Sequence, residues 1–340
     1  MAVTWDGCKV LVTGGASFIG SHLVDALVGR GAHVRVVDNL SSGRYEYIAD
    51  LVKAGTIEFI EGELLEPSLV KRAVEGISYL FHLSADHGGR GYVDLHNVEC
   101  STNLIHDGQL FREAAKAKVE KVIFASSGCI YPNYLQTDPQ KELYLTEDLA
   151  GPPYDADNMY GWAKLMGELT LRHYAQRGLL RAASCRYFTV YGPRGKEDHA
   201  VIAMIARAFI RQNPFEVWGT GEQIRNWTYI DDIVEGTIRA AESIDDGTAV
   251  NLGTMERIRV ADAAAMILRY MEVEIPLKFL PHMPTGPYNR VASNRLAKEL
   301  LNWEPRVAFS EGVRRTVDWY VNSRNPEEVR TRLEAMLTER

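Results

Sequence analysis

The 340-residue sequence predicts an α/β protein, in which a doubly wound parallel sheet is followed by a smaller α/β lobe. Three observations support this fold class. Short apolar runs alternate with segments of helical periodicity through about residue 188, which is typical of parallel sheets covered by helices. A glycine-rich turn joins the first apolar run to the first helical segment. From Thr189 onward, loops rich in Gly, Pro and Arg connect shorter helical segments.

The apolar runs predict six strands, at residues 8–13, 33–38, 57–60, 78–83, 121–126 and 181–186. Helical periodicity predicts helices near residues 20–30, 67–75, 101–117 and 159–178 in the first part, and at 200–212, 231–242 and 260–271 in the second. We therefore expect a sheet domain over 1–188, to which later segments cross back, and a lobe formed mainly by 189–320. The polar segment 321–340 is expected to be a surface helix.

The glycine-rich turn, residues 12–20, has the sequence Val-Thr-Gly-Gly-Ala-Ser-Phe-Ile-Gly. A glycine turn between a buried strand and a helix lets the backbone approach a pyrophosphate, which then lies at the positive helix N-terminus. Asp38 ends the next apolar run, 18 residues after Gly20. A carboxylate at this distance binds a ribose 2′-hydroxyl and repels a 2′-phosphate. These features are typical of a Rossmann-type fold that binds NAD.

Tyr160 and Lys164 form the second motif, in Tyr-Gly-Trp-Ala-Lys. Their i, i+4 spacing places both side chains on one face of a helix. A free phenol has a pKa near 10, so it acts as a base at neutral pH only when an ammonium ion and the nicotinamide charge stabilise its anion. Ser127, about thirty residues earlier, supplies a hydroxyl. A Tyr/Lys pair on a helix is more often a solvated face, but here it follows a complete cofactor motif.

In these motifs the sequence resembles the extended short-chain dehydrogenase/reductase superfamily, and within it the NAD-dependent nucleotide-sugar epimerases and dehydratases. The resemblance runs from about residue 8 to about residue 320 and includes Asp38-Asn39-Leu40, Phe81-His82-Leu83-Ser84-Ala85, Ser126-Ser127 and Arg186 through Pro193. It implies that Ser127 binds the sugar C4 hydroxyl while Tyr160 removes its proton and NAD accepts the hydride. The cofactor contacts that it implies are Gly14, Ser17, Phe18, Ile19, Gly20, Asp38, Asn39, Ser41, Glu63, Leu64, Leu83, Ala85, Tyr160 and Lys164.

Three positions depart from the pattern of that family. Ser17 replaces a glycine, so the backbone approaches the pyrophosphate less closely there, or the hydroxyl binds a phosphate oxygen instead. Glu63 stands where an Asp meets the adenine. Thr189 replaces an Asn that touches the sugar nucleotide, which warns against copying substrate contacts.

Gly128-Cys129 follows Ser127 where related dehydratases carry an Asp-Glu pair, so assisted loss of water has no evident proton donor. The loop around Cys129 resembles that of GDP-mannose 3,5-epimerases, in which a cysteine and a lysine act on opposite sugar faces. A ketone at C4 acidifies the C3 and C5 protons, and a thiol beside them can exchange one. His199 aligns with that lysine, and Lys196 is the alternative. If both point away, Cys129 inverts one centre at most.

The substrate contacts that we expect are Gly88, Gly89, Thr189, Arg207, Gln223, Arg225 and Arg290. Guanidinium groups suit the oxygens of a diphosphate. Arg225 and Arg290 match positions that hold the nucleotide in relatives, whereas Arg207 is equally well explained as a surface residue. The glycines let the sugar ring pass close to the backbone, or form a flexible loop.

Composition limits the other possibilities. A net charge of −7 and a pI near 5.8 argue against a nucleic-acid or anionic-membrane binder. The sequence has no signal peptide and no apolar run of about 18 residues. Its four cysteines lack metal-ligand spacing, so we expect free thiols, no metal and a cytoplasmic protein. The resemblance implies a homodimer.

The leading hypothesis is a nucleotide-diphosphate-sugar epimerase that oxidises C4 transiently and inverts C5, C3 or both. A UDP-hexose 4-epimerase, in which Cys129 has no chemical part, is the first alternative. A UDP-glucuronate decarboxylase needs the same oxidation and is less favoured. A non-catalytic NAD-binding regulator is disfavoured because Ser127, Tyr160 and Lys164 are all present.

Overall fold

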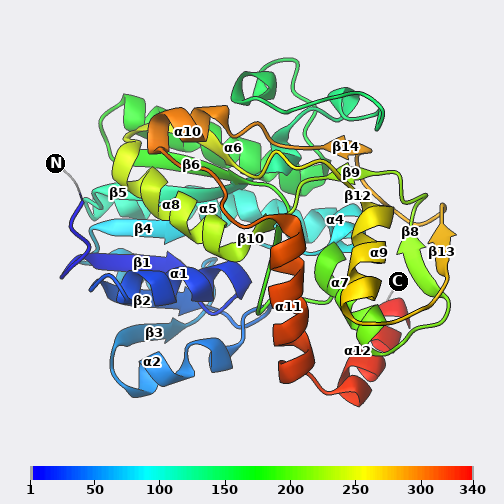
Figure 1. The fold of residues 1–340 in the computed structure, drawn as a ribbon. Coiled ribbons are helices and arrows are strands. Elements are labelled where there is room, and N and C mark those ends of the chain that lie inside the picture. Colours follow the sequence, from blue (N-terminus) through cyan, green and yellow to red (C-terminus); the bar gives the residue numbers. More distant parts are fainter. Residues whose placement is uncertain (1–2, 339–340) are drawn as a thin grey trace.

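The computed structural model describes residues 3–338 and places a seven-stranded parallel sheet at the centre (Figure 1). The strand order is β11-β6-β5-β4-β1-β2-β3. The strands are β1 (Lys9–Thr13), β2 (His33–Asp38), β3 (Ile57–Glu61), β4 (Tyr79–His82), β5 (Lys121–Ser127), β6 (Arg181–Tyr187) and β11 (Asp246–Leu252). The predicted fold class and its six strands are thus confirmed. The seventh strand was missed because its sequence, Asp-Gly-Thr-Ala-Val-Asn-Leu, gains its burial only by pairing with β6.

Helices cover both faces of the sheet. One apolar core joins the sheet to α1 (Phe18–Val28) and α8 (Ile230–Ser243), and a second joins its other face to α3 (Pro67–Val74), α5 (Asn97–Lys116) and α6 (Asn158–Gln176). The short helices α2 (Ala49–Lys53) and α4 (Arg90–Leu95) lie in connections. Four 3₁₀ turns complete this part: Tyr45–Tyr47, Gly128–Ile130, Asn133–Leu135 and Glu147–Ala150.

The second lobe is built from small sheets and helices beside the carboxyl edge of the large sheet (Figure 1). Its strands are β7 (Val190–Tyr191), β8 (Phe215–Trp218), β9 (Ile224–Arg225), β10 (Thr228–Tyr229), β12 (Ile258–Arg259), β13 (Leu277–Leu280) and β14 (Asn289–Arg290). Its helices include α7 (Ala200–Phe209) and α9 (Val260–Tyr270). The later helix α10 (Arg295–Leu301) returns to pack on α8 and β11, and α11 (Phe309–Ser323) packs on α7 and α9.

The C-terminal segment differs from the expected single surface helix over 321–340. Helix α11 continues to Ser323, and α12 (Pro326–Thr338) then begins at a proline, which favours the first turn of a helix. Val329 and Leu333 of α12 are buried, and Arg332 lies 3.3 Å from the Glu197 carboxylate. Residues 339–340 lie outside the described part of the chain.

Two further expectations concern the whole chain. All four cysteines, Cys8, Cys100, Cys129 and Cys185, are free thiols, as expected. Among the helices that the structure describes, none combines the length and the apolar character needed to cross a membrane.

Helix α6 lies unusually close to β5 and to the turn that follows it. A Cβ at Gly161 would collide with the Cys129 carbonyl oxygen, and one at Gly167 would lie 2.6 Å from the Phe124 ring. The Asp157 amide, just before α6, donates to the Cys129 carbonyl over 2.8 Å. These contacts fix the distance between the loop after β5 and the first turns of α6.

We predict that Gly161→Ala lowers the free energy of unfolding by about 2 kcal/mol, because a backbone carbonyl cannot move aside as a side chain can. Urea denaturation measures this change. Gly91→Ala in α4, away from the exposed apolar surface of α5, is the matched control, since the nearest atom to its added Cβ lies at an ordinary 3.9 Å. That control should gain up to about 1 kcal/mol from helix propensity. Equal stability of the two variants would contradict the close approach.

Candidate active site

A cavity of about 590 Å³ opens where the carboxyl ends of the parallel strands meet the second lobe. Ligands of doubly wound proteins bind at this edge, because the loops after successive strands gather there. Every predicted cofactor residue lines the cavity: Gly14, Ser17, Phe18, Ile19, Gly20, Asp38, Asn39, Ser41, Glu63, Leu64, Leu83, Ala85, Tyr160 and Lys164. So do Ser127, Cys129 and His199.

The glycine turn after β1 is tightly packed. Gly14 has a φ of +71°, and a Cβ there would lie 3.0 Å from the Ser84 amide nitrogen. A Cβ at Gly20 would collide with the Gly14 carbonyl. Ser17 is the N-cap of α1, but its hydroxyl is directed at Asp38 Oδ2, 3.5 Å away. The side chain of Ser17 thus lies between the glycine turn and Asp38, on the cofactor side of the cavity.

Asp38 is fixed at the end of β2 by two backbone amides. Ala16 N–H donates to Oδ2 and Leu40 N–H donates to Oδ1, each over 2.9 Å. Burial raises the pKa of Asp38, although both amide bonds oppose this. Farther along the same wall, Asn39 Nδ2 donates to Glu63 Oε2 over 2.7 Å. The two acids thus lie on one side of the cavity, where Glu63 is more exposed.

Tyr160 lies between the end of β5 and the loop after β4, which carries His87. Burial raises the pKa of its phenol, and Cys129 adds to this, whereas the hydrogen bond with Ser127 lowers it. Ser127 also accepts from the Cys129 amide over 3.1 Å. Lys164 is buried, and its Nζ lies 5.8 Å from the centre of the Tyr160 ring. The phenol therefore ionises only with the help of nearby positive charge, as the sequence analysis expects.

Cys129 is in contact with an arginine from the second lobe. Arg290 Nη1 donates to Cys129 Sγ over 3.2 Å, while Arg290 Nε donates to Gln136 Oε1 over 2.8 Å. The third nitrogen, Nη2, donates to Asp157 Oδ2 over 2.9 Å. Arg90 donates to the same carboxylate from the other side, over 2.8 Å. Asp157 thereby holds two guanidinium groups, one of which touches the thiol.

Arg225 adds a third guanidinium to this wall. Burial lowers its pKa to about 9, and the charges of Arg290 and Arg90 contribute. Its Nη2 donates to the Thr285 carbonyl over 2.8 Å. Within this group, Asp157 and Asp94 are the carboxylates that bond the arginines. The excess positive charge suits a polyanionic ligand.

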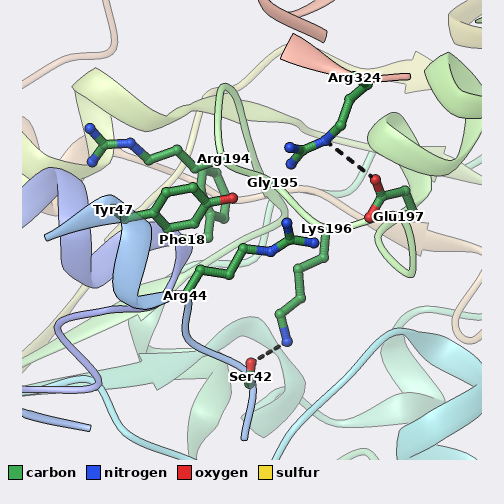
Figure 2. A pocket seen from close by; sticks show the side chains of 9 residues that line it. All are labelled: Phe18, Ser42, Arg44, Tyr47, Arg194, Gly195, Lys196, Glu197 and Arg324. Carbon is green, nitrogen blue, oxygen red and sulfur yellow. Dashed lines mark hydrogen bonds and ion pairs between the residues drawn. The ribbon is translucent and has the colours of Figure 1, made fainter. Parts of the chain in front are cut away.

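The two proposed partners of Cys129 lie differently. Lys196 reaches the loop after β2 and donates to the Ser42 hydroxyl, beside Arg44 (Figure 2). His199 is the N-cap of α7, and its ring centre lies 6.2 Å from that of His87. His87 lies 6.2 Å from the Tyr160 ring in turn. The rings of His87 and His199 therefore follow one another from Tyr160 toward the start of α7. The Lys196 ammonium instead donates a hydrogen bond to Ser42.

Two predicted substrate contacts, Arg207 and Gln223, do not line the cavity. Arg207 lies outside the cavity lining, because it occupies the last turn of α7 while only the start of that helix reaches the cavity. Gln223 is buried, with its amide against Gly219 rather than in the cavity. Gly88, Gly89, Thr189, Arg225 and Arg290 do line the cavity.

The two glycines of the loop after β4 have a packing role. A Cβ at Gly88 would lie 2.6 Å from Tyr92 Cβ, and one at Gly89 would collide with the Asp198 carbonyl. Close approach to protein atoms therefore already requires glycine here, apart from any passage of a sugar ring.

Comparison with known proteins agrees with this geometry. Residues 10–253 match the model of the NAD dependent epimerase/dehydratase family. The chain belongs to this family. It is 30% identical to GDP-mannose 3,5-epimerase of Arabidopsis thaliana over 321 residues, which cover 92% of this chain and 82% of the relative. It is also 30% identical to UDP-glucuronic acid decarboxylase 1 of the same plant, over 92% of this chain and 70% of the relative.

Among solved structures, the epimerase is similar to UDP-glucuronic acid 4-epimerase from Bacillus cereus, which was crystallised with UDP-glucuronic acid and NAD. The TM-score is 0.82 at 29% identity, with 92% of this chain and 98% of the other covered. The epimerase is thus an NAD-dependent isomerase. Its glycine turn, its helix N-terminus and Asp38 fit the cofactor, because each supplies the contact that a dinucleotide requires. Bound NAD supplies the hydride acceptor.

Sequence reasoning missed three residues of the site: His87, Arg90 and Asp157. Asp157 is the N-cap residue of α6, a common place for Asp, yet its side chain makes no cap hydrogen bond. Its carboxylate is turned to the two arginines instead. Nothing in the sequence distinguishes this orientation from an ordinary cap.

We predict that Asp157→Asn destabilises the epimerase by about 3 kcal/mol, because it leaves the largely buried Arg290 without its anion and removes one of the two carboxylates that pair with Arg90. Burial alone would raise the pKa of Asp157, but both arginines lower it. A lowered carboxyl pKa stabilises the fold above about pH 4, and this contribution is lost as the pH falls through the folded pKa. Asp94→Asn, at a more exposed pair with Arg90, should cost less than about 1 kcal/mol. Urea denaturation from pH 3 to pH 8 measures both; equal losses would contradict the shared-anion role.

Proposed function

We propose that the epimerase acts on a nucleotide-diphosphate hexose by transient oxidation at C4, followed by inversion at C5, C3 or both, as in GDP-mannose 3,5-epimerase. One observation carries this proposal: Cys129 shares a cavity with Ser127, Tyr160 and Lys164, and its thiol accepts a hydrogen bond from Arg290.

In this mechanism Ser127 binds the C4 hydroxyl and Tyr160 removes its proton. Their mutual hydrogen bond places both groups at one point. Lys164 is buried beside Tyr160 and stabilises the phenolate through its charge. When C4 is reduced again, the same phenol returns the proton.

Cys129 exchanges a proton at the carbon next to the C4 ketone. The Arg290 N–H stabilises negative charge on the sulfur, which favours its action as a base. His199 is the proposed acid on the opposite face. Its ring lies in the cavity near His87, whereas the Lys196 ammonium is bonded to Ser42. Arg225 and Arg290 are proposed to hold the diphosphate.

A UDP-hexose 4-epimerase is the second candidate, supported by the similarity to a solved UDP-glucuronic acid 4-epimerase. In that case the 4-keto sugar rotates and accepts hydride on its other face, and Cys129 takes no part. The decarboxylase alternative is supported by the relative of that activity. A non-catalytic regulator would bind NAD without reducing it in the presence of any sugar nucleotide.

We also propose that the protein is a homodimer. Helices α5 and α6 pack side by side and expose large apolar residues on their outer surface: Val98, Leu104, Ile105, Trp162 and Met166. Such a surface is suited to pairing with a second copy. The cytoplasmic location stays a prediction from the free cysteines.

We predict that GDP-mannose incubated with the epimerase in deuterium oxide gains deuterium at C5 or C3, because these positions are acidified by the C4 ketone. Proton NMR measures the exchange, and UDP-glucose and UDP-glucuronate are tested in the same way. Inversion at C4 without deuterium would establish the 4-epimerase instead. Loss of the C6 carboxylate as carbon dioxide would establish the decarboxylase.

Cys129→Ser should abolish this exchange while leaving NAD reduction by the same substrate largely intact, since Ser127 and Tyr160 perform the oxidation. Absorbance at 340 nm measures the reduction. Cys185→Ser, at a buried thiol that lies outside the cavity lining, is the matched control and should exchange normally. Equal exchange in wild type and Cys129→Ser would remove Cys129 from the mechanism.

His199→Asn should slow inversion at least tenfold, whereas Lys196→Met should leave the inversion step intact and weaken cofactor retention. The reason is that Lys196 bonds the loop after β2, on the cofactor side. Single-turnover NMR and a filtration assay for NAD measure the two effects. The reverse pattern would assign the acid to Lys196.

A further inference from the structure

Beneath the active site lies a buried polar cluster that the mechanism above does not use. It consists of Thr13 at the end of β1, His82 at the end of β4, and Asn103, His106 and Asp107 on α5. Each is at most 5% exposed. Burying so many polar groups is costly unless they are hydrogen-bonded, so the partner of each group is informative.

The carboxylate of Asp107 is the centre of this cluster. His82 Nε2 donates to Oδ1 over 2.9 Å, because an ionised carboxylate only accepts. The other nitrogen, Nδ1, then accepts from the Thr13 hydroxyl over 2.7 Å. Burial lowers the pKa of His82 to about 4, so the ring is neutral. Burial alone would raise the pKa of Asp107, but its contacts with His106 and His82 lower it, so Asp107 is ionised.

Asn103 orients the ring of His106 through a hydrogen bond. Its Oδ1 accepts from the Asp86 amide over 2.7 Å, and its Nδ2 donates to the Asp86 and Cys100 carbonyls. The amide is thereby oriented, and His106 Nε2 has to donate to Asn103 Oδ1. The other ring nitrogen, Nδ1, lies 3.0 Å from Asp107 Oδ1.

The Asp107 carboxylate can therefore accept a further hydrogen bond on the side that faces α6. Its Oδ2 is buried and has no hydrogen-bond partner within the described residues. It lies 3.2 Å from the position of a Cβ at Gly167, one turn beyond Lys164 on α6. Glycine at this position leaves the carboxylate oxygen open toward that helix.

Lys164 is a buried cation for which a nearby anion is needed. It is 1% exposed, and among the described residues no carboxylate lies within 4 Å of its Nζ. Its Nζ lies over the face of Phe124, 4.6 Å from the ring centre. Burial lowers the pKa of Lys164, and Asp107 is the single charge that raises it. The titratable groups around this pair are His82 from β4, His106 from α5, Tyr160 from α6 and His87 from the loop after β4.

We propose that Asp107 is the buried counter-ion of Lys164, and that His82 fixes its carboxylate so that Lys164 stays an ammonium ion beside Tyr160. Asp107 is thus a positioning residue, because it acts on the reaction only through Lys164. Through Thr13 and Asn103 the same cluster joins the end of β1, before the cofactor turn, to Asp86, where the loop after β4 begins. This proposal rests on the role of Lys164 and not on the identity of the sugar.

The test is a titration of the NAD-bound enzyme that needs no substrate. The ¹³C shift of the Lys164 Cε, assigned by comparison with Lys164→Met, reports the charge of the side chain. In Asp107→Asn the midpoint should fall by about one pH unit or more, because the opposite charge is removed. Asp232→Asn is the matched control: this buried carboxylate accepts from the Arg306 and Val307 amides, away from the cavity. The control should lose stability and keep the Lys164 midpoint.

An unchanged midpoint in Asp107→Asn would overturn the proposal, whatever happens to stability. If Asp107→Asn does not fold, Asp107→Ser removes the same charge, leaves room for a water molecule and is titrated in its place. With a substrate in hand, the alkaline limb of the pH-rate profile should move down with the midpoint. Absence of turnover with every sugar nucleotide would refute the proposed function and leave the titration unaffected.

Discussion

The approach of helix α6 to the loop after β5 is the constraint on which the site depends. Gly161 leaves no space between the helix and the Cys129 carbonyl, and the Asp157 amide bonds that carbonyl over 2.8 Å. Ser127 and Cys129 on one side, and Tyr160 and Lys164 on the other, are therefore held at a fixed separation. Positioning of this kind is a large part of catalysis, because a misplacement of about 1 Å can cost on the order of a hundredfold in rate.

A buried ion pair joins helix α6 to the neighbouring strands β5 and β6. Glu168 of α6 bonds Arg186 of β6 over 2.9 Å, and it also accepts from Ser126 of β5. Both charged side chains are at most 3% exposed. Such a pair adds little net stability, but removal of one partner is costly, so it defines how the helix and the two strands fit together.

Electrostatics divides the cavity into distinct regions. Asp38 and Glu63 lie on the cofactor side, whereas Arg90, Arg225 and Arg290 gather around Asp157 near the thiol. Asp157 and Asp107 each place one negative charge where cations are buried. The first anion fixes the arginine that touches Cys129, and the second faces the helix that carries Lys164. Asp107 lies on a helix in which the sequence shows no catalytic motif, whereas Asp157 stands three residues before Tyr160 without being part of its motif.

The sequence by itself determined the parallel sheet, the cofactor turn and NAD, and it singled out Ser127, Tyr160 and Lys164 as candidate site residues. Those features are local: a strand, a turn and a helix follow one another, and spacing along one helix places two side chains together. Only the tertiary structure decided that Arg290 reaches Cys129 across 161 residues, that Lys196 turns to Ser42, and that Arg207 lies outside the cavity. Strand β11 and the roles of the Asp107 and Asp157 carboxylates were likewise decided only by the tertiary structure. Their roles depend on neighbours that are distant in sequence, and no local pattern encodes which buried groups meet.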